Sequence, residues 1–313
     1  MLKEDFWRYS NGMIELNTTI NSPLHTHPDM PRNVHVVTDC EARLKLGFTL
    51  DADVTRLTER SHYGPLRVQK PLYPEDKKIC HAIIVHPPGG ILGGDILRTQ
   101  VCVEEGAQAL ISTPGAAKWY KANGKISQQF LRLDVGAGAS LEWLPQETIF
   151  FDCADVLLKQ DINLALDAAL IFCDIFCFGR TASNEQFTIG KVKQSTTIHR
   201  DGKLIWFEQG RLSGGSSAMT SQVGLAHASV TANFLAIGGG TISQQHINAL
   251  REAAASQLSA GEQFGATLVK GVAVVRYLGD SSEQARRLML LAWQFLRPVV
   301  IGHDAISLRV WNT

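Results

Sequence analysis

The sequence predicts a mainly β protein of layered, solenoid-like architecture with two α-helices in its C-terminal part. Three observations support this fold class. Apolar and polar residues alternate from residue 43 onward, as in a half-buried strand. Segments between residues 101 and 172 resemble one another at a regular interval. Helical periodicity is confined to the last quarter of the chain, so strands and helices do not alternate as in a Rossmann sheet.

The N-terminal segment differs in composition from the rest of the 313-residue chain. Residues 1–40 mix proline, asparagine, histidine and threonine without a period, and we predict a flexible extension there. In "RLKLGFTL", Leu44, Leu46 and Phe48 fall on one side of a predicted strand. We therefore predict that residues 41–313 form a single β-rich domain.

The predicted layers are clearest where the chain resembles itself. When Gly106 is placed over Gly136, "VCVEEGAQALIS" lies over "LRLDVGAGASLE", and a weaker copy, "INLALDAALIF", follows after a similar interval. Alternating apolar residues precede a turn, and small apolar residues follow it. Stacked β-layers need this pattern because each layer buries its face on the next. Chance similarity between two hairpins is the alternative, and two good copies do not decide between them.

Two amphipathic helices are predicted near the C-terminus, because apolar residues recur on one helical face in each segment. The first covers residues 243–260, with Ser243 as a suitable N-terminal cap and Gly261 as a suitable end. The second covers residues 282–297, and Pro298 is expected to stop it. Either helix could dock on a partner protein, although packing on the parent sheet is the commoner role of such a face.

Composition narrows the classes of function. Lys+Arg and Asp+Glu both total 30, so no net charge would draw the chain to nucleic acid or to an anionic membrane. No apolar run reaches the roughly 18–20 residues that span a bilayer, and no secretory signal is recognisable. The six cysteines lie mostly in apolar runs such as "LIFCDIFCFG" and are expected to be reduced. The sequence therefore predicts a soluble cytoplasmic protein that acts through specific contacts.

The stretch "HPPGGILGGD" (residues 86–95) is a glycine-rich loop that invites comparison with phosphate-binding loops. It matches neither G-x-x-x-x-G-K-[ST] nor G-x-G-x-x-G, and a strand rather than a helix follows it. A turn between strands, with glycines at positive φ, is the favoured interpretation. That interpretation leaves His86 and Asp95, at the two ends of the loop, unexplained.

Metal-ligating residue types recur near the predicted turns, but without the spacing of a closed site. They are His81, His86, Asp95, Glu104, Glu105, Asp152 and Cys153. Cys173 and Cys177 have no second pair, and on a strand they would share a buried face with Ile175. Scattered imidazoles and carboxylates suit weak, transient contact with a divalent ion rather than a permanent metal cage.

Hydrolytic catalysis has little support in the sequence. No G-x-S-x-G motif is present, and Ser213 lies in a glycine-rich turn without an identifiable base. His199 is expected to edge a hairpin turn around Asp201 and Gly202. No acid, base and nucleophile can be assigned together.

Six longer motifs combine aromatic residues, charges, proline and glycine. They are "GPLRVQKPLYPE" (64–75), "HPPGGILGGDIL" (86–97), "STPGAAKWYKA" (112–122), "EWLPQETIFF" (142–151), "FGRTASNEQF" (178–187) and "LRPVVIGHDAISLRVWNT" (296–313). Their aromatic residues Trp119, Tyr120 and Trp143 belong either to the core or to a protein-binding surface. Together and in this order, the motifs resemble the urease accessory protein D family (UreD, called UreH in some bacteria). The chain departs from the family at Asn184, where glycine is usual, and at Leu308, where proline is usual.

The resemblance implies a role in urease maturation without enzymatic turnover. Members of the family are cytoplasmic scaffolds for nickel insertion, with a largely β, helicoid fold and two helices. They bind the urease apoprotein and accessory protein F, which recruits the GTPase, accessory protein G. No tightly bound cofactor is expected. Nickel is the transient cargo, and an internal passage through the D protein is thought to carry it.

The candidate residues for nickel transit are carboxylates and one imidazole within the motifs. They are Asp95, His86, Glu142, Glu147, Asp152 and Glu185. Each could instead be a satisfied structural residue that caps a turn or pairs with Arg180 or Lys118. Two other functions stay open: a β-solenoid module that binds an unrelated partner, and a hydrolase with an unrecognised site.

Overall fold

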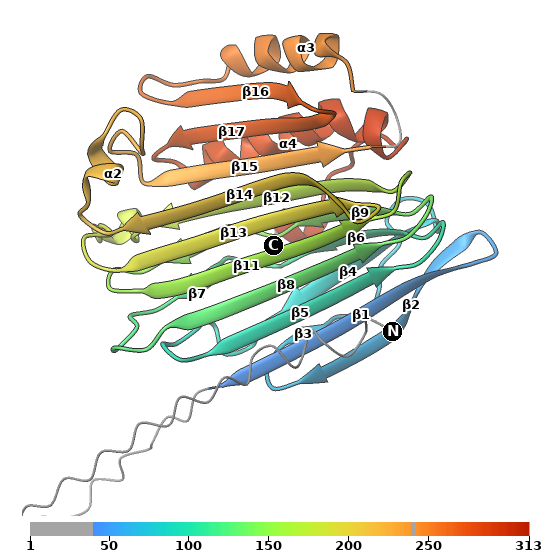
Figure 1. Ribbon diagram of the computed structural model, residues 1–313, viewed down its shortest axis with the longest axis horizontal. Helices are drawn as coiled ribbons and strands as arrows, with labels where there is room; N and C mark the ends of the chain where they lie inside the picture. Colours follow the sequence, from blue (N-terminus) through green and yellow to red (C-terminus); the bar gives the residue numbers. More distant parts are fainter. Residues whose placement is uncertain (1–39, 239–241, 313) are drawn as a thin grey trace, which may run out of the picture. The chain divides into compact units, whose positions relative to one another are not determined.

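Two β-sheets pack against each other in the computed structural model, which describes residues 40–238 and 242–312 (Figure 1). Apart from Cys40, the predicted extension over residues 1–40 lies outside the described residues. Strands dominate and the two longer helices are both near the C-terminus, so the predicted fold class is confirmed.

The first sheet has seven strands in the order β14-β13-β11-β8-β5-β1-β2. Its five central strands are parallel, and the two edge strands, β2 and β14, are antiparallel to their neighbours. The strands are β1 (Glu41–Asp51), β2 (Val54–Tyr63), β5 (Ile96–Val103), β8 (Ser127–Val135), β11 (Asp155–Leu164), β13 (Lys191–Arg200) and β14 (Lys203–Ser213).

The second sheet follows the order β16-β17-β15-β12-β9-β6-β4-β3, with the short strands β7 and β10 attached beside β12. Strands β4, β6, β9 and β12 are parallel, and β15, β17 and β16 continue the sheet in antiparallel fashion. The strands are β3 (Arg67–Val68), β4 (Ile79–Val85), β6 (Gln108–Ser112), β7 (Ala117–Trp119), β9 (Ser140–Leu144), β10 (Thr148–Phe150), β12 (Ala169–Phe178), β15 (Val230–Ile237), β16 (Gln263–Val269) and β17 (Val272–Gly279).

From β4 to β13 the chain alternates between the two sheets. Strands β4, β6, β9 and β12 belong to the second sheet, and the strands that follow each of them, β5, β8, β11 and β13, belong to the first. Each pair of strands therefore forms one rung, and successive rungs stack through parallel hydrogen bonding. This confirms the stacked layers that the internal repeat predicts.

The predicted alignment of the repeat was wrong by two residues. In the sheet, Val101 pairs with Leu133 rather than with Leu131. Gly106 therefore corresponds to Gly138, and both glycines have positive φ, 68° and 61°. A shift of two keeps every side chain on the same face of a strand, so the apolar pattern alone cannot detect it.

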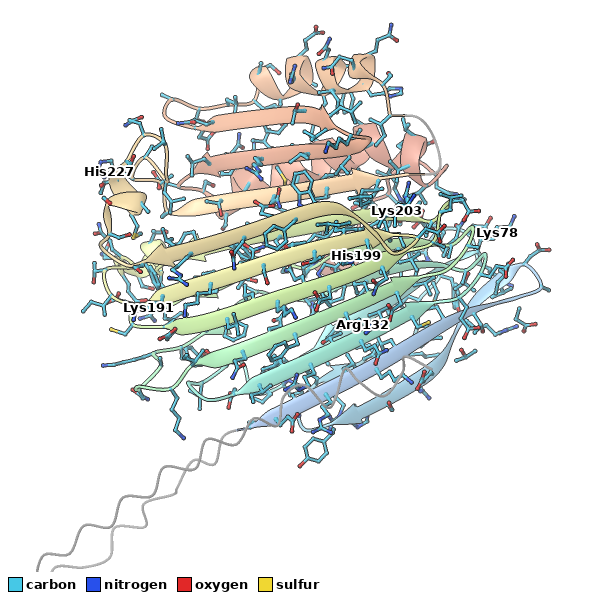
Figure 2. The ribbon with its side chains drawn as sticks, viewed as in Figure 1. Lys78, Arg132, Lys191, His199, Lys203 and His227 are labelled. Atoms are coloured by element: carbon cyan, nitrogen blue, oxygen red, sulfur yellow. The ribbon has the colours of Figure 1, made fainter. Side chains whose placement is uncertain are left out.

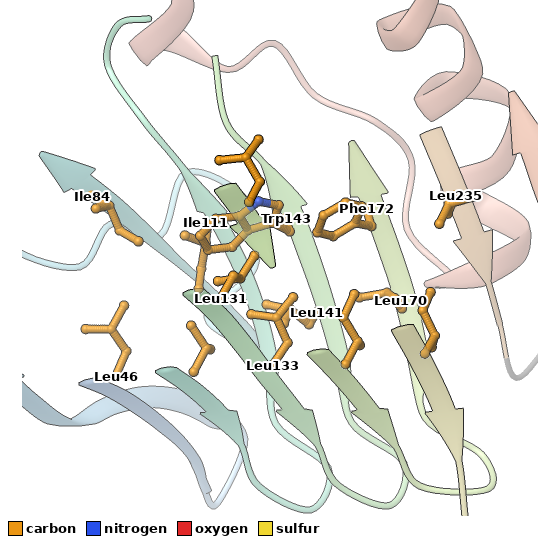
Figure 3. Packing of buried hydrophobic residues seen from close by; sticks show 14 of the residues in the cluster. Leu46, Ile84, Ile111, Leu131, Leu133, Leu141, Trp143, Leu170, Phe172 and Leu235 are labelled. Carbon is orange, nitrogen blue, oxygen red and sulfur yellow. The ribbon is translucent and has the colours of Figure 1, made fainter. Parts of the chain in front are cut away.

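The inward side chains of the rungs form the main core between the sheets (Figure 3). Leu133 and Leu46 from the first sheet and Leu141 and Leu170 from the second are at most 2% exposed. Burying one such side chain stabilises the fold by roughly 1.5–3 kcal/mol. The stacking of rungs therefore builds one continuous apolar interior.

A second apolar core lies between the outer face of the second sheet and the helices α3 (Gln244–Ala255) and α4 (Ser282–Val300). The predicted packing of both helices on the parent sheet is thus confirmed. A short helix, α2 (Ser217–Thr220), and two 3₁₀ turns, Thr181–Ser183 and Arg309–Asn312, were not predicted. Among the described residues, no helix is both long and apolar enough to cross a membrane.

The helix boundaries differ from the prediction at both C-terminal ends. Ser243 caps α3 as predicted, but the helix ends at Ala255, well before Gly261. Helix α4 continues through Pro298, because proline removes only its own N–H donor. The N–H of Ile301 still bonds to the Arg297 carbonyl at 2.8 Å, so the last turn survives.

The rung repeat gathers the long connections at one end of the sheets. Each long connection leads from the second sheet to the first, over residues 86–95, 113–126, 145–154 and 179–190. Parallel strands end at the same edge, so these four segments, here called the motif end, become neighbours. A bridge between Ile91 and Trp119, and the pairing of β7 with β10 and of β10 with β12, link them. The motif end therefore unites four of the six sequence motifs.

Candidate functional site

The glycine-rich loop over residues 86–95 is a turn between β4 and β5, as predicted. Gly89 and Gly94 have φ of 79° and 96°, which side chains rarely tolerate. A Cβ atom on Gly93 would lie 1.8 Å from the carbonyl oxygen of Ala122. The glycines therefore serve the turn and its close contact with the next connection.

Asp95 closes this turn. Its buried carboxylate accepts the N–H of Leu92 at 2.8 Å and the N–H of Cys40 at 3.0 Å. His86, at the other end of the loop, is half-buried and lines a pocket. Burial lowers the pKa of His86, and the charge of Asp95 partly offsets that effect. The two ends of the loop, which the sequence leaves unexplained, therefore interact electrostatically.

Glu142 belongs to a buried charge cluster under α4. Arg297, which is fully buried, donates to Glu142 at 3.0 Å and to Glu75 at 2.6 Å. Trp293 also donates to Glu142 at 2.5 Å, and His81 contacts Glu75 at 2.7 Å. Burial alone would raise the pKa of Glu75, but the bonds from His81 and Arg297 lower it to about 2. The cluster fastens α4 to the second sheet.

The other three candidate carboxylates also have protein donors. Glu147 pairs with Arg286 of α4. Asp152 accepts the backbone N–H groups of Thr188 and Ile189 at 2.7 and 2.8 Å, and Glu185 accepts the N–H of Asp152 at 3.0 Å.

Glu185 also pairs with Arg180 at 2.5 Å, and this hydrogen bond lowers the pKa of the Glu185 carboxyl. The adjacent Asn184 has φ of 56°, a left-handed conformation that asparagine tolerates in place of the family's usual glycine. The turn around Glu185 is thus compatible with this departure from the family.

The structure therefore distributes the six predicted residues over three places: the glycine-rich turn, the α4 contact, and the contact between the connections that precede β11 and β13. Among the described residues, no group of three or more His, Cys, Asp or Glu side chains is arranged to hold a metal ion. Trp119 and Trp143 are core residues, 0% and 7% exposed, so they do not form a partner surface. Cys173 and Cys177 are buried on the same face as Ile175, as predicted.

A row of polar side chains crosses the interior and was not predicted. On the inner face of the first sheet, five residues are in register across β5, β8, β11, β13 and β14: Thr99, Leu131, Gln160, Thr196 and Glu208. Only Leu131 is apolar. Gln160 and Thr196 are 3% and 1% exposed, and the Thr196 hydroxyl donates to Gln160 at 2.5 Å.

The second sheet supplies a facing row. Asp174, Asn233 and Arg276 are in register across β12, β15 and β17. Gln160 donates to Asp174 at 2.7 Å, while Asn233 and Arg276 donate to Glu208 at 3.1 and 2.8 Å. Together, the two sets of residues form what is here called the interior row.

Asp174 is the most perturbed carboxyl of the interior row. Burial raises its pKa to about 7, the Gln160 hydrogen bond opposes this rise, and the charge of Glu208 adds to it. Near neutral pH the side chain therefore exchanges readily between its neutral and charged forms.

Two pockets reach the interior row from different sides. One, of about 270 Å³, lies at the motif end and is lined by His86, Thr99 and Asp174, among others. The second, of about 540 Å³, is lined by Glu208, Asn233 and Arg276, among others. The interior row thus joins two openings through an otherwise apolar core.

A sequence signal for part of this row was present. Asp174 is the one charge in "ALIFCDIFCF", and strand alternation places it on the face opposite the two cysteines. Glu208 has no comparable signal, because it follows the apolar residues 204–207 and precedes the polar residues 209–211, so it is not a single charge within an apolar strand. Its inward orientation follows from its pairing with Thr196.

The side chains of the interior row are suited to contact a cation, and they are not arranged to catalyse the transfer of a chemical group. Carboxylate, amide and hydroxyl oxygens can replace part of the hydration shell of a divalent ion. Thr196 donates to an amide rather than to a carboxylate or imidazole, so its hydroxyl is not an activated nucleophile. Fold and site define a class: a stacked two-sheet β protein with a polar row through its core.

Comparison with known proteins specifies the family. The model of the UreD urease accessory protein family matches residues 40–312. The urease accessory protein UreD of Janthinobacterium sp. (strain Marseille) is 56% identical over 87% of this chain and 92% of its own length. Those of Nitrosospira multiformis and Cupriavidus necator are 47% and 42% identical, over 87% and 92% of this chain and 97% and 99% of their own lengths. The chain belongs to the UreD urease accessory protein family.

Proposed function

We propose that this protein acts in the maturation of urease, as a non-catalytic cytoplasmic scaffold that passes nickel to the apoenzyme. Its partners are the urease apoprotein, accessory protein F and, through F, the GTPase accessory protein G. Family membership supports the role in maturation. The observation that supports the proposed nickel passage is the interior row, because residues of this row line two pockets and continue between them through the core.

The interior row suits a cargo that must not be retained. A structural metal site holds its ion with three or four strong ligands at fixed distances. Here the carboxylates Asp174 and Glu208 each accept a hydrogen bond from a protein donor, so an ion competes with that donor for the negative charge of the carboxylate. Contact with Ni²⁺ is therefore transient, and no cofactor is held tightly.

The first test measures urease activity and nickel per active site in cells that carry the urease structural genes and the other accessory genes. Omission of this gene is expected to leave soluble, nickel-poor urease that the gene restores. Equal activity with and without the gene would refute the role in maturation.

The second test uses Asp174→Leu, which removes the central carboxylate but keeps the volume of the side chain similar. We expect the partner complex to form and the nickel content of urease to fall at least several-fold. Asp167→Asn is the control, because Asp167 lies in the turn between β11 and β12, outside the interior row, and accepts the N–H of Gly138. Normal nickel content in the Asp174→Leu variant would refute the passage while leaving the scaffold role intact.

Two of the six sequence-predicted transit residues are tested in the same assay. Asp95→Ala and Glu142→Ala are expected to lower the nickel content while complexes still form, if these side chains contact the ion. Both carboxylates also hold protein donors, so each variant is compared at equal amounts of folded protein. Unchanged activation in both variants would remove them from the transit route.

A further inference from the structure

Strand β14 is an unprotected edge of the first sheet. It pairs with β13 alone, and within the described part of the chain residues 203–212 make no backbone hydrogen bond outside that pairing. Four consecutive apolar residues, 204–207, follow Lys203 in its first half, and Leu204 and Phe207 are 57% and 59% exposed. Both edge strands carry charges, Lys203, Glu208 and Arg211 on β14 and Arg56, Glu59 and Arg60 on β2, but only β14 has four consecutive residues without a charge.

A groove runs beside this edge. The 540 Å³ pocket is bounded by β14 on one side and by β15, β16 and β17 on the other. Gly210 of β14 and Gly265 of β16 both line it, and a Cβ atom added to either would meet nothing within 4 Å. Phe176, Phe178 and Leu212 supply its apolar lining. The groove is therefore open to a chain lying along β14.

The polar groups around the groove would be satisfied by a ligand that supplies hydrogen-bond donors and negatively charged side chains. The Oδ1 atom of Asn233 is buried and has no hydrogen-bond donor. Arg211 lines the groove, and its direct cross-strand neighbour is another cation, Lys193. Like charges in this position repel, and among the described residues neither has a carboxylate within ion-pair distance. The one acid of β14, Glu208, is already held by Arg276 and Asn233.

We propose that β14 receives an extended segment of a partner protein, which adds as a further strand and carries alternating apolar and acidic side chains. Its backbone would pair with the free edge, its apolar side chains would enter the groove, and its acids would meet Arg211 and Lys193. This inference rests on the proposed scaffold function, because it assigns the surface that one partner occupies.

A second copy of this chain fits the edge less well. Antiparallel pairing of two β14 strands about Phe207 would place Lys203 of each copy opposite Arg211 of the other. Both ends of the new pair would then carry facing cations. Figure 2 shows Lys203 on β14 itself and Lys191 and His199 on the neighbouring strand β13, so two further lysines lie on these two strands.

The test uses the full chain and a fluorescein-labelled peptide of sequence Thr-Val-Glu-Val-Asp-Val-Glu-Val-Thr, with anisotropy and amide hydrogen exchange as readouts. We expect binding that slows exchange in β14 at least 10-fold, with no change in β2. Gly210→Trp fills the groove and should weaken binding at least 10-fold, as should Arg211→Glu. Ser61→Trp is the control, because Ser61 is exposed on β2 at the opposite edge of the sheet, and it should bind like the wild type.

Three outcomes would overturn the proposal. The first is unchanged exchange in β14 at saturating peptide, and the second is equal binding of a peptide whose acids are replaced by lysine. The third is concentration-dependent dimerisation of the free chain that Gly210→Trp abolishes, which would assign the edge to a second copy. None of these results depends on nickel transfer, so each is distinguishable from failure of the proposed function in the cell-based urease assay.

Discussion

The side-chain amide of Gln160 donates a hydrogen bond of 2.7 Å to the carboxylate of Asp174, across the space between the two sheets. Gln160 belongs to β11 and Asp174 to β12, so the bond joins the two strands of one rung from inside. An apolar pair would hold the rung together equally well. The polar pair is costly to bury and therefore calls for a role beyond packing.

Asp174 makes stability depend on pH in a defined direction. Its pKa is about 7 in the folded protein and about 3.9 in an unfolded chain, so the folded state binds the extra proton between these values. The associated stability is present below about pH 4 and is lost as pH rises through about 7, at up to ~1.4 kcal/mol per pH unit. Asp174→Asn should remove this loss while still accepting the Gln160 bond.

Urea unfolding of both proteins at pH 5, 6, 7 and 8 measures the difference. The free energy of unfolding of the variant, relative to that of the wild type, should increase with pH up to about pH 7. Above pH 7 the difference between the two proteins should stay constant. A constant difference from pH 5 to 7 would show that Asp174 does not carry the linkage.

Arg297 is expected to be the most sensitive charge in the protein. Arg297→Met would leave Glu142 and Glu75 close together and buried without their shared cation. Loss of one partner from a buried ion cluster typically costs about 3–5 kcal/mol. Arg43→Met, at an exposed pair with Glu41, should cost less than about 1 kcal/mol.

The measurement is chemical denaturation of both variants at pH 7. Adding Glu142→Gln to Arg297→Met should recover part of the lost stability, because it removes one uncompensated charge. Equal, small losses for Arg297→Met and Arg43→Met would contradict the assignment of a buried cluster.

The glycine-rich turn can be tested by a single methyl group. Gly93→Ala would place its Cβ 1.8 Å from the Ala122 carbonyl oxygen, so the backbone of two connections must shift. We expect a loss of roughly 1–3 kcal/mol, the usual cost of overpacking. Gly115→Ala, where nothing lies within 4 Å, should be close to neutral. Thermal unfolding compares the two, and similar melting temperatures would argue against the close approach.

Local pattern was sufficient to predict the strands, the layered class and the start of each long helix. Alternation fixes which face of a strand is buried, and Ser243 and Ser281 are suitable N-terminal caps. The register of the rungs was not predictable, because a shift of two residues preserves the alternation. The end of α4 was missed because Pro298 occurs in its last turn, where one lost hydrogen bond is tolerated.

The candidate site was harder to predict than the fold. Motif membership selected Asp95, Glu142 and Glu185, whose carboxylates the structure shows bonded to nearby donors. The interior row depends instead on pairings between distant strands, such as Thr196 with Glu208. No local pattern encodes such pairings, although Asp174 in an apolar strand was a visible exception.

Nickel delivery should depend on pH if Ni²⁺ contacts Asp174 on its way through the interior row. A carboxylate binds a cation only after losing its proton, so metal and proton compete for the side chain. With a pKa of about 7, the charged fraction of Asp174 rises roughly five-fold between pH 6 and 7 and little above pH 8. Nickel incorporated per urease active site by purified complexes should follow this rise at limiting nickel. Asp174→Asn should lower the amount and flatten the profile, whereas Asp167→Asn, outside the interior row, should keep both. Parallel profiles for the wild type and Asp174→Asn would mean that nickel reaches urease without contact with this carboxylate.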